Sequence, residues 1–369
     1  MAVTSRIGTN SVSGAYEMPN SSPLYNSFRL IVKAMTESIA DKFPESLPAF
    51  QHMFPDDAAC ARYLEAIRWR SGFACPRCAD QAEPFRFAAR PGVLRCRACK
   101  RDISLTAGTV MERTHMPLSV WFWAVFLSSS MTPGISAVQL QRQLGLTRYE
   151  TAFQILHKLR AGMTRTSGRI GAGTHVEVDE TWVGGVTRGK GRGIHDQACV
   201  IGAVEVKQRA KKETQRKERR GGRIAGRLRL AVVPDRSAKA LCGFVEEAVD
   251  QATDMVVTDG WQGYAPLAEK GYQHLSVAER GDPNVAEDYL PIIHLVFSNL
   301  KSWLNGTHHG VSAEHLQAYL NEFTFRFNRR FYPFNAFRSL LGLAMEAEAP
   351  TYEELYDGDW QHPGLKSGK

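Results

Sequence analysis

The sequence predicts an α+β protein of several domains, in which a small cysteine-rich module and a helical segment precede a mixed β-sheet with flanking helices. Three observations lead to this fold class. Two close cysteine pairs lie in the N-terminal third, a helical pattern covers residues 118–163, and apolar β-branched runs alternate with helical ones from residue 175 onward. Strands followed by a helix and a further strand are typical of a mixed sheet that helices cover.

The composition describes a folded chain with one strongly basic segment. Apolar residues make up 43% and charged residues 23% of the 369 residues, which excludes a disordered chain or a coiled-coil rod. The net charge is +8, but residues 207–229 alone carry +9, so the basicity is local. Such a segment is expected to hold nucleic-acid phosphates or, alternatively, to form a solvated surface loop.

Hydropathy and cysteine usage indicate a cellular compartment. No run approaches the roughly 20 apolar residues that span a bilayer, and residues 1–35 show no secretory signal. We therefore expect a cytoplasmic protein without a membrane partner. Four of the seven cysteines form close pairs, which in such a chain favours metal binding over disulfides.

The cysteine pairs predict a structural zinc site. Cys75 and Cys78 form one CxxC knuckle, Cys96 and Cys99 form another, and seventeen residues separate them. Two knuckles at this spacing can complete a tetrahedron of thiolates around Zn²⁺, whereas a redox pair would need only one knuckle. The remaining cysteines lack this spacing and are expected to be buried thiols: Cys60, Cys199 and Cys242.

A helix-turn-helix is predicted within the helical segment. Residues 136–144 and 148–160 form two short helical patterns around Gly145, with Thr147 as the expected N-cap of the second helix. Any helical hairpin gives a similar pattern, so a purely structural hairpin remains an alternative. The side chains expected to face a DNA groove are Arg148, Tyr149, Gln154, His157 and Lys158.

Two aspartates follow apolar, strand-like runs. Asp179 is expected to end one strand and Asp259 another, so adjacent strand ends can bring the two carboxylates together. Clustered carboxylates repel unless a cation neutralises them, and paired Mg²⁺ ions are a standard device for phosphoryl transfer. The alternative for either residue alone is a turn or cap.

A helix that begins at Pro291 offers further candidates. His294 and Lys301 are seven residues apart, so they lie within about 20° of each other around the helix axis. Asn299 is rotated from His294 by about 140° and cannot share that side. His294 and Lys301 are therefore the preferred functional pair, although a lone helical histidine is often a core residue.

Taken together, these motifs resemble the bacterial insertion-sequence transposases of the DDE superfamily, in the ISXO-like group with an N-terminal zinc ribbon. The resemblance covers about residues 50–345. The segments that carry it are the cysteine module, Ile-Ser-Leu-Thr-Ala-Gly-Thr-Val-Met (103–111), Val-Asp-Glu-Thr-Trp-Val-Gly-Gly (178–185), Val-Thr-Asp-Gly-Trp-Gln-Gly-Tyr (257–264), Leu-Lys-Ser-Trp-Leu-Asn-Gly-Thr-His-His-Gly-Val-Ser (300–312) and Phe-Arg-Phe-Asn-Arg-Arg (325–330).

The resemblance implies an RNase H-like catalytic domain that binds Mg²⁺ or Mn²⁺. It assigns Asp179 and Asp259 as metal ligands, and it places His294 as the third ligand with Lys301 seven residues later. The third member is most commonly acidic in this group. A neutral imidazole is a softer ligand and brings no negative charge.

The implied activity is metal-dependent cleavage of transposon ends, bound at their terminal inverted repeats, and their transfer to target DNA by a nucleoid-associated homo-oligomer. The alternatives are a catalytically inactive relative, a zinc-ribbon DNA-binding regulator, or a nuclease that cuts without joining. Further residues expected to contact DNA are Lys211, Lys212, Arg219, Arg220, Arg329 and Arg330. The expected divisions are a flexible tail (1–50), a zinc ribbon with a preceding helix (51–112), the helix-turn-helix region (113–165), a catalytic domain (174–345) with a basic insert (207–229), and a C-terminal tail (346–369).

Overall fold

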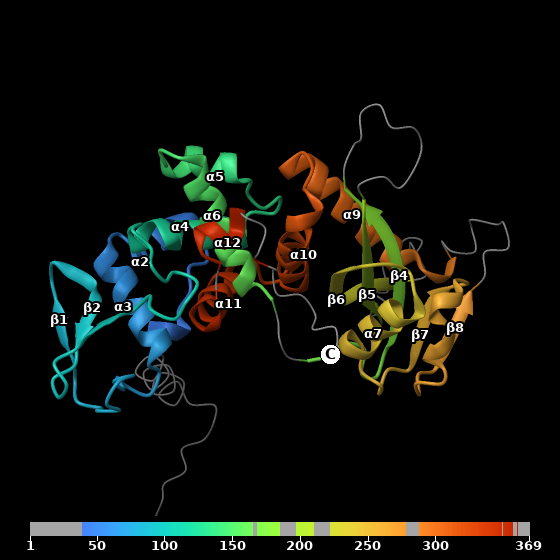
Figure 1. The fold of residues 1–369 in the computed structure, drawn as a ribbon, viewed down its shortest axis with the longest axis horizontal. Coiled ribbons are helices and arrows are strands. Elements are labelled where there is room, and N and C mark those ends of the chain that lie inside the picture. The colour runs from blue at the N-terminus through green and yellow to red at the C-terminus, as the bar shows by residue number, and fades with distance from the viewer. Residues whose placement is uncertain are drawn as a thin grey trace, which may run out of the picture.

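The protein is described here by a computed structural model that covers residues 39–164, 168–184, 197–209, 222–277, 288–348, 350–356 and 360. In this part of the chain the N-terminal helices and ribbon lie on one side and a five-stranded sheet lies on the other, with α10 between them (Figure 1). Most of the basic segment falls outside the described residues, and with it four residues expected to contact DNA: Lys211, Lys212, Arg219 and Arg220.

The N-terminal half combines a small antiparallel sheet with short helices. Its helices are η1 (Ile39–Asp41), α2 (Leu47–Met53), α3 (Asp57–Arg68), α4 (Leu118–Ser130), α5 (Ala137–Leu144) and α6 (Tyr149–Gly162). Its strands pair in the order β1 (Phe85–Phe87), β2 (Arg90–Arg95) and β3 (Asp102–Ser104). The helix expected before the zinc ribbon is confirmed as α3, which begins where the Asp56 carboxylate accepts the N–H of Ala59 at 2.7 Å.

The two helices around Gly145 are confirmed, but the predicted N-cap is wrong. Gly145 ends α5 in the left-handed conformation with φ 61°, which suits glycine. The N–H of Leu146 then returns to the carbonyl of Gln141 at 2.9 Å, and this bond continues the turn by one residue. As a result, α6 begins at Tyr149 and its N-cap is Arg148, not Thr147.

The second half is built on a mixed sheet in the order β6-β5-β4-β7-β8. Its strands are β4 (His175–Val183), β5 (Ala198–Gln208), β6 (Arg223–Val233), β7 (Met255–Asp259) and β8 (His274–Val277). β4 pairs antiparallel with β5 and parallel with β7, which confirms the predicted mixed sheet. The sequence did not indicate β8. The apolar run over residues 228–233 indicates β6, but the strand begins earlier, at Arg223.

Helices cover both faces of this sheet. α9 (Pro291–His308) packs on one face, and α7 (Ala238–Ala248) with η3 (Gln262–Leu267) packs on the other. Successive residues of a strand face opposite sides, so Val176 and Val178 join the α7 core whereas Val204 and Val206 join the α9 core. α10 (Ala313–Asn328) lies along β6, where the Asn328 side chain bonds both backbone groups of Leu228.

The C-terminal helices complete the core of the N-terminal half. α11 (Pro333–Glu346) packs against α4 and α6, and the short α12 (Tyr352–Tyr356) follows. Phe337 of α11 is fully buried among Phe50, Phe54 and Phe122. Residues 333–345, which the sequence assigns to the catalytic domain, therefore pack in the N-terminal core.

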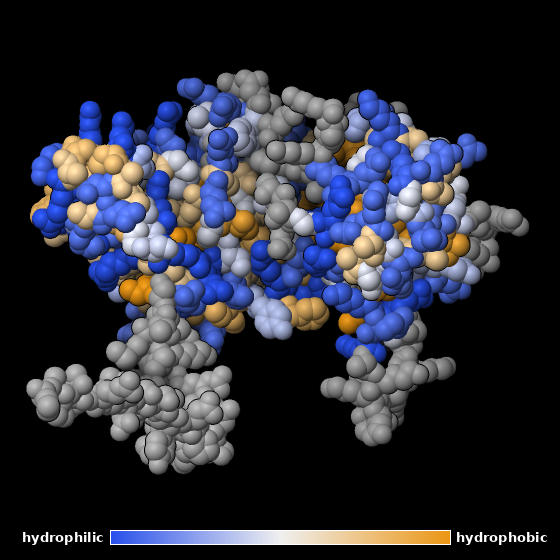
Figure 2. Space-filling model, turned by 90° about the horizontal axis from the view of Figure 1, so that it is seen from below, coloured by the Kyte–Doolittle hydropathy of each residue, from blue (hydrophilic) through white to orange (hydrophobic). Residues whose placement is uncertain are grey.

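The surface seen from below is mostly hydrophilic, with hydrophobic residues in small separate areas (Figure 2). Among the described residues, no helix is both long and apolar enough to cross a membrane.

Candidate functional site

The sheet register brings the two predicted aspartates level with each other. β4 and β7 run parallel and pair Glu177 with Val257, so two residues further Asp179 lies beside Asp259. Asp179 lies in the middle of β4, not at its end as the sequence suggested, because this strand continues to Val183. Asp259 is the last residue of β7.

Helix α9 brings His294 to the same place. The imidazole Nε2 of His294 lies 3.3 Å from Oδ2 of Asp179, and the two side chains are 36% and 14% exposed. Lys301 lies two turns further along α9 and is exposed. The predicted partners from β4 and α9 therefore come together, and Lys301 faces solvent beside them.

A third carboxylate, Glu180, lies close to the aspartates. One oxygen of each of Asp179, Glu180 and Asp259 lies within 4.8 Å of the others, and His294 contacts Asp179. Glu180 follows Asp179 on β4 and so faces the α7 side of the sheet. Glu180 was not predicted as a site residue, because its closeness to Asp259 depends on how β4 and β7 pair. The alternation of β4 directs its side chain to the face opposite His294.

Glu180 is held by neutralising partners. It accepts a 2.5 Å hydrogen bond from the Tyr264 hydroxyl and forms an ion pair with Arg236, while its own side chain is 3% exposed. Burial raises the pKa of the Glu180 carboxyl, and it raises the pKa of Tyr264 well above its ordinary value. The Arg236 guanidinium also lies 4.2 Å from the ring centre of Trp261 and 3.9 Å from Asp259 Oδ2.

The donor set fits a divalent cation. Carboxylate oxygens are the ligands that Mg²⁺ and Mn²⁺ prefer, and an imidazole is acceptable to Mn²⁺. Asp179 stands between the oxygens of Asp259 and the nitrogen of His294, so it can share one ion with each. Arg236 offsets the charge of Glu180 and also lies near Asp259, whereas Asp179 is the acid that contacts His294.

The four cysteines form a second candidate metal site. The sulfur atoms of Cys75 and Cys99 are 3.8 Å apart and those of Cys78 and Cys96 are 3.7 Å apart. A tetrahedral Zn²⁺ with Zn–S bonds near 2.3 Å has sulfur atoms about 3.8 Å apart, so the quartet fits zinc. The three other cysteines are buried, as expected: Cys60, Cys199 and Cys242.

Comparison with known proteins agrees with both sites. Residues 171–328 match the ISXO2-like transposase domain, and residues 55–102 match the transposase zinc-ribbon domain. The chain belongs to the zinc-ribbon group of DDE transposases.

A relative from a mobile element supports this assignment. It is described as an uncharacterized protein in transposable element ISH50 of Halobacterium salinarum, and it is 26% identical over 294 residues, covering 74% of this chain and 91% of the relative. No solved structure matches the chain. The catalytic-domain match includes both aspartates, His294 and Lys301, and the ribbon match includes all four clustered cysteines.

The helix-turn-helix of the transposase presents fewer cations than the sequence suggested. Arg148 and Tyr149 are exposed at the start of α6, but His157 is fully buried beside Phe153 and Tyr319. Lys158 is partly buried, and its Nζ donates to the carbonyl of Glu112 at 3.3 Å. The sequence reading considered packing only against the first helix and missed that α10 covers the far side of α6.

The predicted arginine pair is also engaged within the protein. Arg330 donates to the carbonyls of Ala225, Gly226 and Phe327, and these bonds fix the end of α10 on β6. Arg329 lies 3.9 Å from the ring centre of Phe325 and donates to the carbonyl of the same residue. Both side chains therefore have partners within the protein, and their contacts with DNA stay a prediction.

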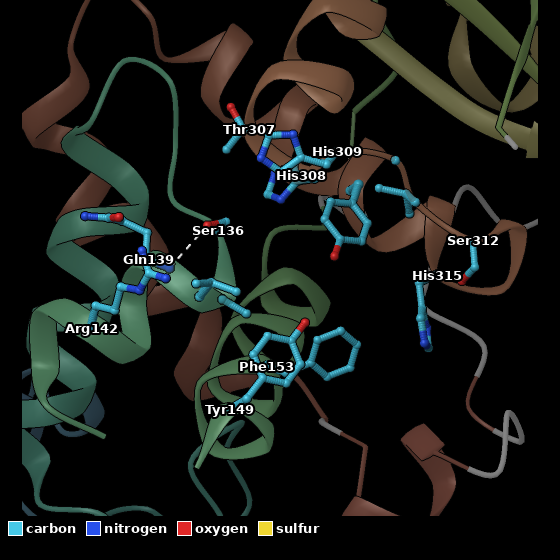
Figure 3. A pocket seen from close by; sticks show the side chains of 15 residues that line it. Ser136, Gln139, Arg142, Tyr149, Phe153, Thr307, His308, His309, Ser312 and His315 are labelled. Carbon is cyan, nitrogen blue, oxygen red and sulfur yellow. Dashed lines mark hydrogen bonds between the residues drawn. The ribbon is translucent and has the colours of Figure 1, made fainter. Parts of the chain in front are cut away.

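A groove connects the helix-turn-helix to the end of α9. Its volume is about 550 Å³, and it lies between the start of α5 and the turn from α9 to α10 (Figure 3). Arg142 and Tyr149 come from the helix-turn-helix side, whereas His309 and His315 come from the other side. The groove thus joins the helix-turn-helix surface at Arg142 and Tyr149 to the C-terminal end of α9.

Proposed function

We propose that this transposase binds the terminal inverted repeats of its mobile element and carries out metal-dependent strand cleavage and strand transfer. The parallel register that sets Asp179 beside Asp259, with His294 Nε2 3.3 Å from Asp179, is the observation that supports this chemistry most directly. In-line phosphoryl transfer needs such a cluster of acidic ligands beside a DNA strand.

Asp179, Asp259 and His294 would hold divalent ions, Mg²⁺ or Mn²⁺. When bound, the ions polarise the scissile phosphate and lower the pKa of the attacking water or hydroxyl. Asp179 orients the donor set because it contacts His294 and lies beside Asp259. Lys301 is placed to contact a DNA phosphate, and its charge would stabilise the negative charge that develops there.

The other parts of the chain would bind and align DNA. The cysteine quartet would hold a structural Zn²⁺ that folds the ribbon, and Arg148 would contact phosphates from the start of α6. The expected divisions (51–112, 113–165 and 174–345) then correspond to ribbon, helix-turn-helix and catalytic functions. Two transposon ends must be joined in one event, so we propose a homodimer or larger assembly.

The test is a joining assay with purified protein, labelled inverted-repeat DNA and Mn²⁺. We expect joined product from the wild type, and we expect Asp179→Asn to abolish joining while DNA affinity stays unchanged. Asp254→Asn is a matched control, because Asp254 is exposed just before β7 at the other end of this strand. Normal joining by Asp179→Asn would overturn the assignment.

The same assay separates the alternatives. Binding without any cleavage by the wild type would indicate a regulator or an inactive relative. The inactive relative is an alternative because His294 stands where this group most commonly has an acid. Nicked DNA without joined product would indicate a nuclease.

A further inference from the structure

We propose that Glu177 is a positioning residue of the catalytic centre, which holds α9 in register so that His294 meets Asp179. This inference rests on the proposed function, because it concerns the same centre. Glu177 touches neither DNA nor the donor atoms, and it acts through the helix that it holds.

Helix α9 has no N-cap side chain of its own. Its N-cap residue, Leu290, has no side chain that can accept a hydrogen bond, and Pro291 at the first position has no N–H. The next two N–H groups, of Ile292 and Ile293, both donate to Oε2 of Glu177 at 2.8 Å. A buried carboxylate from β4 therefore supplies the negative cap that the positive end of a helix favours.

The Glu177 cap lies next to the contact between Asp179 and His294. Glu177 and Asp179 are two residues apart on β4, so they face the same side of the sheet. On α9, His294 directly follows Ile293. One strand and one helical turn are thus joined twice, by the carboxylate cap and by the contact between Asp179 and His294.

A shift of α9 by one residue would break the second contact. Such a shift moves each side chain by about 1.5 Å along the helix axis and turns it by about 100°. The imidazole of His294 would then leave Asp179, and Lys301 would turn with it. The two bonds to Glu177 oppose this shift.

The sheet also sets the distance between α9 and the strands beneath it. Gly202 of β5 pairs with Asp179, and a Cβ atom at Gly202 would lie 3.0 Å from side-chain carbons of both Ile293 and Phe297. The helix therefore rests directly on the strand at the level of the catalytic aspartate. Gly202 sets the distance between helix and sheet, whereas Glu177 sets the register along the helix.

A buried carboxylate at Glu177 lowers the stability of the fold at one of its two oxygens. Its second oxygen, Oε1, is buried and has no hydrogen-bond partner among the described residues. An unsatisfied buried oxygen destabilises a fold, so the two bonds that Glu177 accepts from α9 must offset this cost. A buried carboxylate at this position is therefore better explained by its control over α9.

The test compares Mn²⁺ affinity, measured by calorimetry on zinc-loaded protein without DNA, with joining activity. Glu177→Leu keeps the volume and removes the acceptor, and we expect a loss of Mn²⁺ affinity of about tenfold or more, the size typical for residues that orient metal ligands. Glu177→Gln keeps an acceptor oxygen and should restore most of that affinity. DNA affinity should be unchanged in both.

Glu205→Gln is the matched control. Glu205 is also a buried glutamate of this sheet, but it bonds Gly171 and Arg227 away from the catalytic centre. It should lower the melting temperature and leave Mn²⁺ affinity unchanged. Equal losses of Mn²⁺ affinity in Glu205→Gln and Glu177→Leu would overturn the proposal, because the effect would then be general destabilisation.

Glu177→Met provides a second route if Glu177→Leu does not fold. It keeps the side-chain length and also removes the acceptor, so wild-type Mn²⁺ affinity in this variant would also overturn the proposal. A wild type that binds Mn²⁺ through Asp179 but joins no DNA would refute only the proposed function. A Glu177→Leu variant that joins DNA with normal Mn²⁺ affinity would refute only the positioning role.

Discussion

Replacing Glu322 by Gln is expected to destabilise the transposase by about 4 kcal/mol, because it leaves a buried arginine without its counter-charge. Arg160 Nε lies 2.8 Å from Glu322 Oε2, and the two side chains are 2% and 1% exposed. Arg326 lies 3.8 Å from the other carboxylate oxygen, so Glu322 balances two cations. Removal of one partner from a buried pair typically costs about 3–5 kcal/mol.

Urea unfolding followed by tryptophan fluorescence and circular dichroism measures this loss. Glu246→Gln is the matched control: Glu246 pairs with Lys270 at the same 2.8 Å distance, but these side chains are 42% and 37% exposed. That exposed pair should contribute less than about 1 kcal/mol.

The double replacement Arg160→Met with Glu322→Leu should recover only part of the lost stability, since two apolar groups replace two charges but Arg326 still lacks its carboxylate. The ion pair joins α6 to α10, so the two halves should unfold in one transition. A loss below about 1 kcal/mol in Glu322→Gln, or two separate transitions in the wild type, would refute this reasoning.

Three further predictions concern zinc, pH and salt. Removal of Zn²⁺, or Cys96→Ser, should unfold β2 and β3 and speed hydrogen exchange of the Leu94 and Ile103 amides, while exchange in the large sheet stays unchanged. Burial lowers the pKa of His308 to about 4, so stability should be full above pH 6.5 and fall by about 2 kcal/mol as the pH drops toward 4; His308→Phe should remove this pH dependence from the urea midpoint. Arg148→Ala should lower the salt slope of DNA binding by about one counterion in anisotropy titrations, whereas Lys158→Ala should not.

Features encoded by local spacing could be predicted from the sequence. The two CxxC knuckles bring their own sulfur atoms into position because each knuckle is a short turn. The strand patterns around Asp179 and Asp259 also indicated buried β-structure with acids near the strand ends. His294 and Lys301 followed from the period of a helix that begins at proline.

Features that depend on distant packing could not be predicted in this way. His157 looked like a groove-facing residue, but α10 covers it from more than 150 positions away in the chain. Arg330 looked like a DNA contact, but it is used to fasten α10 to β6. The roles of Glu177 and Glu180 depend on which face of β4 meets α9, and only the assembled sheet determines this.

The most direct test of the catalytic assignment is anomalous X-ray diffraction from crystals of the transposase grown with Mn²⁺. We predict a manganese peak within coordination distance of both Asp179 and Asp259, with His294 beside it. The zinc peak at the four cysteines serves as an internal control for the measurement. A clear zinc peak without manganese at the two aspartates, at saturating Mn²⁺, would contradict the account.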